Sequence, residues 1–190
     1  MPNKPDPPPP DVKAFVDTLN RHRVEYVMIG GIAALLHGSS RATYDLDVLA
    51  RGSLENLERL AAALTSIDAG QHLDSADLRG SSTRWDTSVG RVDVLLSARG
   101  LDGKMSITFR DVVDRRIDIV YDGTTIPVVA LEDLIDMKTA VGRPHDLDTV
   151  SELRAIQAND TVTAEQLMDQ WHVRRIHDDS PPPPEVGLDL

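Results

Sequence analysis

The sequence predicts a mixed α/β (α+β) fold in which helices pack on a mixed β-sheet, and three observations support this. Apolar residues recur at helical spacing near the N-terminus and again after residue 53. Two runs, 26–29 and 45–50, have the length and apolar content of buried strands. Two later runs flank Asp122-Gly123, a strong turn signal for an antiparallel hairpin. Strands that alternate with helices but include a hairpin predict a mixed sheet.

In the first half of the chain, helices and strands alternate. A first helix is marked by apolar residues three and four apart: Val12, Phe15, Val16 and Leu19. Residues 26–29 form a strand, Gly30-Gly31 turns the chain into a short helix over 32–37, and residues 45–50 form the next strand. A second amphipathic helix with Ser53 as its N-cap has the apolar positions Leu54, Leu57, Leu60, Ala61 and Leu64. Residues 68–90 are polar and predict a loop with weak strands.

The second half begins with a strand over 91–96 and continues with a hairpin of strands 117–121 and 125–129. Residues 131–141 form a helix that Gly142 ends, with Pro144 just beyond. Helices over about 146–158 and 164–176 close the domain. We expect one domain over 11–177, with C-terminal helices from about residue 131, between disordered proline-rich tails at 1–10 and 178–190.

Composition excludes several classes of protein. The 190 residues include no cysteine, so disulfides and thiolate metal sites are ruled out. Apolar runs are too short to cross a bilayer and no signal peptide is visible, so we expect a cytoplasmic protein without a membrane partner. The formal net charge of −11 is untypical of a nucleic-acid binder, and the acidic 178–190 tail adds to it. Any RNA contact would need a local basic patch, for which the candidates are Arg21, Arg23, Arg41 and Arg51, or Arg174 and Arg175.

Three carboxylates on two predicted strands form the main candidate site. Asp45 and Asp47 share one face of a strand, about 7 Å apart, and repel by about 2 kcal/mol at an effective dielectric near 20. A divalent cation between them offsets this, and Mg²⁺ prefers such oxygen ligands. Asp93 interrupts an apolar strand, where an unpaired carboxylate is costly. The structural alternatives are exposed acids at a strand end and an ion pair between Asp93 and Arg91.

Two further features could serve a phosphate-containing substrate. Gly30 and Gly31 allow close backbone approach to a phosphate, or form a plain tight turn. Lys138 lies on the inward face of its helix, where it could contact a triphosphate or extend its ammonium to solvent. Asp146 opens the following helix, where an acid also has a purely structural use.

These residues resemble the polymerase-β-like nucleotidyltransferase superfamily, and within it the bacterial minimal nucleotidyltransferases of the AbiEii and MenT toxin type. The resemblance covers roughly residues 24–157 and rests on segments 29–47 and 138–146 together with Asp93. It implies the nucleotidyltransferase fold, a mixed β-sheet with packed helices and a helical C-terminal part. It also implies a nucleoside triphosphate (NTP) as substrate and one or two Mg²⁺ ions as cofactor.

The resemblance also implies roles for particular residues. Asp45, Asp47 and Asp93 would bind magnesium, and Asp93 would complete the metal site or draw the proton from the acceptor hydroxyl. The implied nucleotide-binding residues are Gly30, Gly31, Arg41, Thr43, Lys138 and Arg143. The implied catalytic residues are Asp45, Asp47, Asp93, Lys138 and Asp146.

The function implied is a magnesium-dependent nucleotidyltransferase that moves a nucleoside monophosphate from an NTP to an acceptor hydroxyl. The acceptor implied is the 3′ end of tRNA, and the enzyme would act as a toxin restrained by a cognate antitoxin. One alternative acceptor is a small molecule such as an aminoglycoside, or a protein hydroxyl, which the acidic net charge favours over RNA. A second alternative is an inactive nucleotide-binding module.

Overall fold

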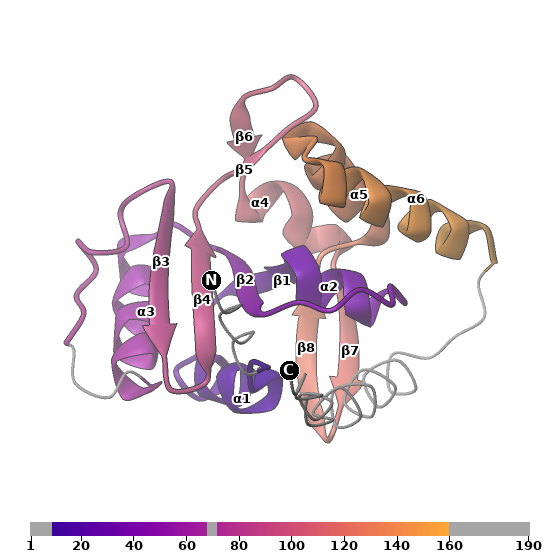
Figure 1. Ribbon diagram of the computed structural model, residues 1–190. Helices are drawn as coiled ribbons and strands as arrows, with labels where there is room; N and C mark the ends of the chain where they lie inside the picture. Colours follow the sequence, from indigo (N-terminus) through magenta and orange to yellow (C-terminus); the bar gives the residue numbers. More distant parts are fainter. Residues whose placement is uncertain (1–8, 68–71, 160–190) are drawn as a thin grey trace, which may run out of the picture.

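The computed structural model describes residues 9–67 and 72–159, which form a six-stranded mixed sheet, a two-stranded sheet and the helices around them (Figure 1). The strands of the large sheet are β1 (Tyr26–Ile29), β2 (Asp45–Ala50), β3 (Ser82–Thr87), β4 (Gly90–Leu95), β7 (Ile117–Tyr121) and β8 (Thr124–Val128). β5 (Ala98–Arg99) and β6 (Met105–Ile107) form the small sheet. The helices are α1 (Val12–Arg21), α2 (Gly30–Leu36), α3 (Leu54–Ile67), α4 (Phe109–Val112), η1 (Val113–Arg115), α5 (Leu131–Val141) and α6 (Pro144–Asn159).

The large sheet has the strand order β3-β4-β2-β1-β8-β7 and contains both kinds of pairing. β2 runs antiparallel to β1 and parallel to β4, while β1 runs parallel to β8. β3 pairs antiparallel with β4 at one edge, and β7 pairs antiparallel with β8 at the other. The predicted mixed sheet with packed helices is confirmed, and β2 and β4 lie side by side near its centre.

Strands β2 and β4 are apolar on one face and carry charged side chains followed by a leucine on the other, because side chains alternate along a strand. Leu46 lies opposite Val92, and Val48 lies opposite Val94, all in the buried core. The same core includes apolar side chains of α1, α2 and α3. The register then requires the odd-numbered residues of β2 to face the other side, together with their partners in β4.

The helices α2, α5 and α6 build the wall that faces the charged side of these strands. α2 contacts β1, β2 and α5, and α5 packs against α6. Figure 1 shows α5 and α6 at the upper right, away from α3 at the left and α1 at the bottom. Gly142 ends α5 with a left-handed φ of 68°, and Pro144 begins α6 at the first helical position, where its missing N–H costs no hydrogen bond.

Most predicted elements appear where periodicity placed them. The strands at 26–29, 45–50 and 117–121 and the helix at 131–141 agree with the structure residue for residue. Asp122 and Gly123 both have positive φ, as a two-residue hairpin turn requires. The strands predicted at 91–96 and 125–129 each begin and end one residue earlier, and the short helix begins at Gly30 because both glycines form its first turn.

The main difference lies in residues 68–90, predicted as a loop with weak strands. Residues 82–87 form the regular strand β3, paired along its whole length with β4. Its side chains are exposed or half-buried in alternation, so the apolar signal of a buried strand is missing. The prediction assigned nothing to 97–116, where β5, β6, α4 and η1 each span only a few residues.

Other predictions concern the ends of the chain. Pro10, placed in the N-terminal tail, is buried, and the amide of Asp11 donates to the carbonyl of Val89 at 2.8 Å. The helix predicted at 164–176, the tail at 178–190 and the arginines at 174 and 175 lie outside the described residues. Within residues 9–67 and 72–159 no helix is both long enough and apolar enough to span a bilayer.

Candidate active site

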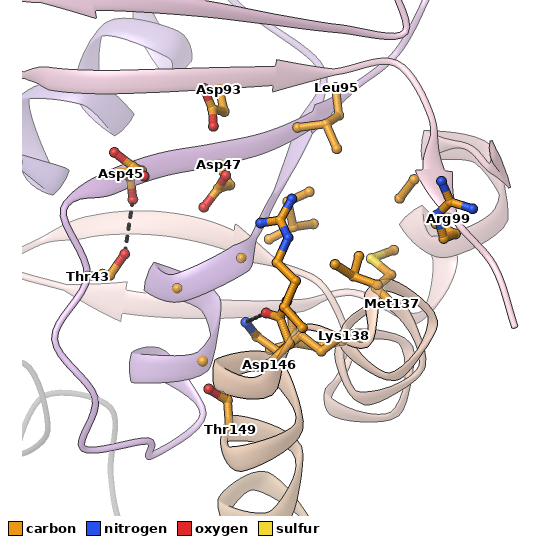
Figure 2. A pocket seen from close by; sticks show the side chains of 18 of the residues that line it. Thr43, Asp45, Asp47, Asp93, Leu95, Arg99, Met137, Lys138, Asp146 and Thr149 are labelled. Atoms are coloured by element: carbon orange, nitrogen blue, oxygen red, sulfur yellow. Dashed lines mark hydrogen bonds and ion pairs between the residues drawn. The ribbon is translucent and has the colours of Figure 1, made fainter. Parts of the chain in front are cut away.

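The acids of β2 and β4 lie on one face of the sheet. Across the parallel pair, Asp47 lies directly opposite Asp93, and Asp45 lies opposite Arg91. Partners in register share a face, and Asp45 and Asp47 share theirs because they are two residues apart. Acids from two separate stretches of chain therefore face the same side of the sheet. Figure 2 shows the three carboxylates above the start of α2.

Asp93 is paired with Arg84 of β3, a residue that sequence reasoning did not identify. Arg84 Nε donates to Asp93 Oδ1 and Nη2 donates to Oδ2, each at 2.6 Å, so both carboxylate oxygens are engaged. The ion pair between Asp93 and Arg91, which was a structural alternative for Asp93, does not form. Arg91 instead contacts Asp86 at 3.2 Å and Asp45 at 3.6 Å. The register explains this, since Arg84 is directly opposite Asp93 in the antiparallel pair.

Asp47 is the electrostatically strained member of the group. Burial raises its pKa to about 6, and the charges of Asp93 and Asp45 act in the same direction. The backbone amide of Gly31 and the charge of Lys138 partly oppose this rise. A carboxylate in this position is stabilised by a further positive charge.

Two glycines make room for these side chains. Gly30 has a left-handed φ of 66°, and a Cβ there would overlap the Asp47 carboxylate. A Cβ on Gly31 would overlap the side chain of Thr43. Both glycines are therefore required by close packing, in addition to forming the turn that the sequence predicts. Because these residues have no side chains, the backbone of α2 lies closer to Asp47 and Thr43 than it could with any other residue type.

The donor set suits a hard divalent cation, although the three acids are not gathered around one point. Asp45 Oδ1 is buried and has no hydrogen-bond partner, and two carboxylates on adjacent positions of one face supply oxygen ligands. Within the described part of the chain, no three acidic or histidine side chains are close enough to hold one metal ion. Arg84 engages both oxygens of Asp93, whereas Asp45 Oδ1 accepts no hydrogen bond. The donor chemistry of Asp45 and Asp47 therefore suits a divalent cation, and the metal-binding role of all three acids stays a prediction.

Lys138 and Asp146 form a nearly buried ion pair between α5 and α6. Lys138 Nζ lies 3.3 Å from Asp146 Oδ1, and their side chains are only 12% and 10% exposed. The ammonium therefore does not extend into solvent, which was the structural alternative for Lys138. Asp146 Oδ2 has no hydrogen-bond partner, and Nε2 of the exposed His145 ring lies 3.6 Å from it.

All residues predicted for the site line one cavity of about 800 Å³. The cavity lies between the charged face of β2 and β4 on one side and the helices α2, α5 and α6 on the other. They are Gly30, Gly31, Arg41, Thr43, Asp45, Asp47, Asp93, Lys138, Arg143 and Asp146. The lining that sequence reasoning missed includes Ser82, Arg84, Leu95, Arg99, Met105 and Met137. Several of these lie in segments without a clear periodic signal; Figure 2 shows Leu95, Arg99 and Met137 at the opposite end of the cavity from Thr43 and Asp45.

Glu152 of α6 holds the irregular segment that carries Arg41 and Thr43. Its carboxylate accepts hydrogen bonds from the Ser40 amide at 2.7 Å and from the Ser39 and Ser40 hydroxyls, both at 2.8 Å. Arg41 Nε lies 3.7 Å from the same carboxylate. Burial alone would raise the pKa of Glu152, but these hydrogen bonds and the Arg41 charge outweigh burial and lower it.

Replacing Glu152 with alanine is expected to lower the free energy of unfolding by about 1–3 kcal/mol at neutral pH, because the buried Ser39 hydroxyl and two exposed donors of Ser40 lose their acceptor. The Glu152 pKa is lowered on folding, so this contribution is present above the ordinary glutamate pKa and is lost as the pH falls through the lowered value. Urea unfolding at several pH values measures it. The matched control is Asp136→Ala, at an exposed acid on α5. Equal losses in both variants would contradict the assigned role of Glu152.

Comparison with solved structures shows the same fold. A protein from Thermotoga maritima described as a nucleotidyltransferase aligns with a TM-score of 0.53 at 18% identity, over 79% of this chain and 91% of its own. The lincomycin-bound lincosamide antibiotic adenylyltransferase LnuA aligns with a TM-score of 0.54 at 14% identity, over 78% of this chain and 99% of its own. No curated protein is detectably similar in sequence.

The family comparison covers most of the chain. The family model described as the AbiEii nucleotidyl transferase toxin of type IV toxin–antitoxin systems matches residues 15–179. That match includes both acid-bearing strands, the two glycines and the helix of Lys138. It agrees with the nucleotidyltransferase fold of the solved structures. The chain is a nucleotidyltransferase and belongs to the AbiEii toxin family.

Proposed function

We propose that this enzyme transfers a nucleoside monophosphate from an NTP to the 3′ end of tRNA in a magnesium-dependent reaction. We further propose that it acts in the cytoplasm as a toxin, restrained by a cognate antitoxin. The observation that carries the proposal is the strand register that sets Asp45, Asp47 and Asp93 on one face beside Gly30. Membership of a toxin family supports the biological role.

The triphosphate would lie against the start of α2 and the helices α5 and α6. Gly30 and Gly31 lack side chains, so phosphate oxygens can approach their backbone. The proposed cationic contacts are Arg41, Lys138 and Arg143, which all line the cavity. They would offset the charge that develops on the leaving pyrophosphate.

The bond changes follow from phosphoryl transfer. The acceptor oxygen forms a bond to the α-phosphorus while the bond from that phosphorus to the bridging oxygen of pyrophosphate breaks. In this proposal Asp93 completes the magnesium site or takes the proton of the acceptor hydroxyl. Asp45 and Asp47 would hold magnesium, which when bound supplies Lewis-acid stabilisation of the phosphate oxygens.

A local basic patch supports an RNA acceptor despite the acidic chain. The cavity wall carries five cationic residues from five separate elements or loops: Arg41, Arg84, Arg99, Lys138 and Arg143. Among the candidate arginines that the structure describes, Arg41 lines this cavity, whereas Arg51 is paired with Glu25 at 2.7 Å. Positive groups around the acids would attract the phosphates of both the NTP and the tRNA end.

An acceptor with an apolar body is the second candidate. One part of the cavity wall is apolar, with Leu95, Ala98, Met105, Met137 and Val141. This lining would suit the apolar part of a small-molecule acceptor. Independently of the lining, the formal net charge of −11 favours a cationic small molecule over RNA. LnuA, of the same fold, is a lincosamide adenylyltransferase.

The test is transfer of label from each of four α-³²P-labelled NTPs in parallel reactions. The acceptors are total tRNA, aminoglycosides and lincosamides, and a protein mixture, each with magnesium and with EDTA. Magnesium-dependent label in tRNA alone is expected. Label only in a small molecule or in protein would replace the tRNA proposal with the alternative, and no label anywhere would support an inactive nucleotide-binding module.

Replacing Lys138 with methionine is expected to reduce kcat/KM for the NTP by about 10²-fold, because a charge close to the phosphates is removed. Asp146→Asn keeps the ammonium but releases it from its partner, so nucleotide affinity should hold or rise. Fluorescent NTP binding and steady-state kinetics measure both effects. The control is Lys13→Met, at a surface lysine on α1 that is paired with Asp17. Unchanged nucleotide binding by a folded Lys138→Met protein would refute this role.

A further inference from the structure

We propose that Arg84 is a positioning residue that occupies Asp93 in the nucleotide-free enzyme and competes with the divalent cation for that carboxylate. This inference rests on the proposed magnesium-dependent function. It concerns an arginine on the edge strand β3, outside the residues that the sequence or the family resemblance identifies. Asp93 can serve the metal only after the Arg84 guanidinium has moved away.

The geometry of the pair supports competition. Both oxygens of Asp93 accept from the Arg84 guanidinium at 2.6 Å, so each oxygen has one lone pair engaged and a positive charge beside it that opposes the approach of a cation. This two-point contact is the strongest geometry that an arginine and a carboxylate can form. It explains why the described acids do not gather into a metal site although Asp47 and Asp93 are directly opposite one another.

The exposure of the two partners makes the pair reversible. The Asp93 side chain is 13% exposed, whereas that of Arg84 is 62% exposed. The guanidinium can therefore move into solvent, where water replaces its contacts with the carboxylate. The carboxylate stays in place on β4. A divalent cation carries twice the charge of the guanidinium, so its attraction to the Asp93 carboxylate can replace that of Arg84.

The surrounding charges indicate what replaces the guanidinium. Two rows of residues cross the strands on this face, Arg84, Asp93 and Asp47 in one and Asp86, Arg91 and Asp45 in the next. Two guanidinium groups thus face four carboxylates, a formal excess of two negative charges. One divalent cation carries the balancing charge. Arg84 reduces the repulsion between Asp93 and Asp47 until that cation arrives with its nucleotide.

The test is Mn²⁺ binding to the nucleotide-free protein, followed by the electron paramagnetic resonance signal of free Mn²⁺. Arg84→Gln is expected to bind Mn²⁺ about tenfold more tightly than the wild type, because one positive charge and one competitor are removed. Arg84→Lys keeps the charge but cannot engage both oxygens, so its affinity should be intermediate. The gain should vanish in Arg84→Gln/Asp93→Asn, since the effect acts through Asp93.

A second arginine offers a matched control. Arg115 contacts Asp133 through two nitrogens at 2.7 and 3.1 Å, with side-chain exposures of 59% and 16%, and it does not line the cavity. Arg115→Gln should leave Mn²⁺ affinity unchanged. If the wild type binds Mn²⁺ and Arg84→Gln binds it equally well or more weakly, this inference is overturned while the proposed function still stands. If none of the proteins binds Mn²⁺, the magnesium-dependent function fails and the inference fails with it.

Discussion

Replacing Asp47 with asparagine is expected to abolish nucleotidyl transfer while making the metal-free protein more stable at neutral pH. Asparagine has nearly the same shape and can still accept from the Gly31 amide, but it lacks the charge that holds a metal. A lost metal contribution of several kcal/mol corresponds to roughly a thousandfold lower kcat. Opposite effects on activity and stability are the signature of a residue kept charged for function.

The stability effect follows from the raised pKa of Asp47, about 6 in the fold against an ordinary value of 3.8. A carboxyl group whose pKa is raised on folding binds its proton more tightly in the native state, so its stability cost grows as the pH rises from about 4 to about 6. Above that window Asp47→Asn should be more stable by about 2–3 kcal/mol, and below it the difference should disappear.

Thermal unfolding from pH 4 to pH 8, with and without magnesium, measures this cost. Magnesium should stabilise the wild type more than the variant. The control is Asp118→Asn, at an exposed acid on β7. An Asp47→Asn enzyme with wild-type turnover would show that the carboxylate has no part in the reaction. A pH-independent stability difference would show that its burial is misassigned.

Replacing Gly30 with alanine is expected to damage both the fold and the site. A Cβ at this position would lie 2.7 Å from Asp47 Cβ and would overlap the carboxylate itself, so Asp47 must move. The left-handed φ of 66° adds a cost of about 1–2 kcal/mol for a residue with a side chain, and overpacking adds about 1–3 kcal/mol. We expect urea unfolding to show the sum of both costs and kcat to fall by at least about tenfold, because catalysis is sensitive to small displacements.

The hairpin glycine Gly123 provides the matched control for Gly30. It has a φ of 73° and would place a Cβ in open space, away from the cavity. Gly123→Ala should therefore lose only the stability that corresponds to the cost of a left-handed φ, and it should keep the wild-type kcat. If both variants lose the same stability and Gly30→Ala keeps its activity, then the close approach between α2 and Asp47 does not matter.

Elements with a full apolar period could be predicted from the sequence, and elements without one could not. β1 and β2 are buried runs between turn residues, and α5 has both an apolar stripe and a glycine stop. The edge strand β3 alternates polar and half-buried residues, so hydrophobic patterning did not distinguish it from a loop. Its pairing with β4 supplies the stability that its own composition does not indicate.

For the site, the sequence predicted some of the residues that line the cavity but not which of them pair. The glycines, the acids and Lys138 stand out because each departs from a regular pattern. The Arg84–Asp93 pair depends on the register of β3, and the contacts of Glu152 join residues 112 positions apart in the chain. Both contacts depend on tertiary packing. Those segments show no clear hydrophobic periodicity, so a single sequence does not indicate how they pack.

The most direct test of the central claim is anomalous diffraction from crystals grown with Mn²⁺ and a non-hydrolysable NTP analogue. The claim is that Asp45 and Asp47 hold a divalent cation at the cavity, with the triphosphate beside Gly30 and Gly31. An anomalous peak within coordination distance of both carboxylates, with phosphate density against the two glycines, is the predicted result. Nucleotide and manganese bound elsewhere on the protein, with Asp45 and Asp47 free of both, would contradict it.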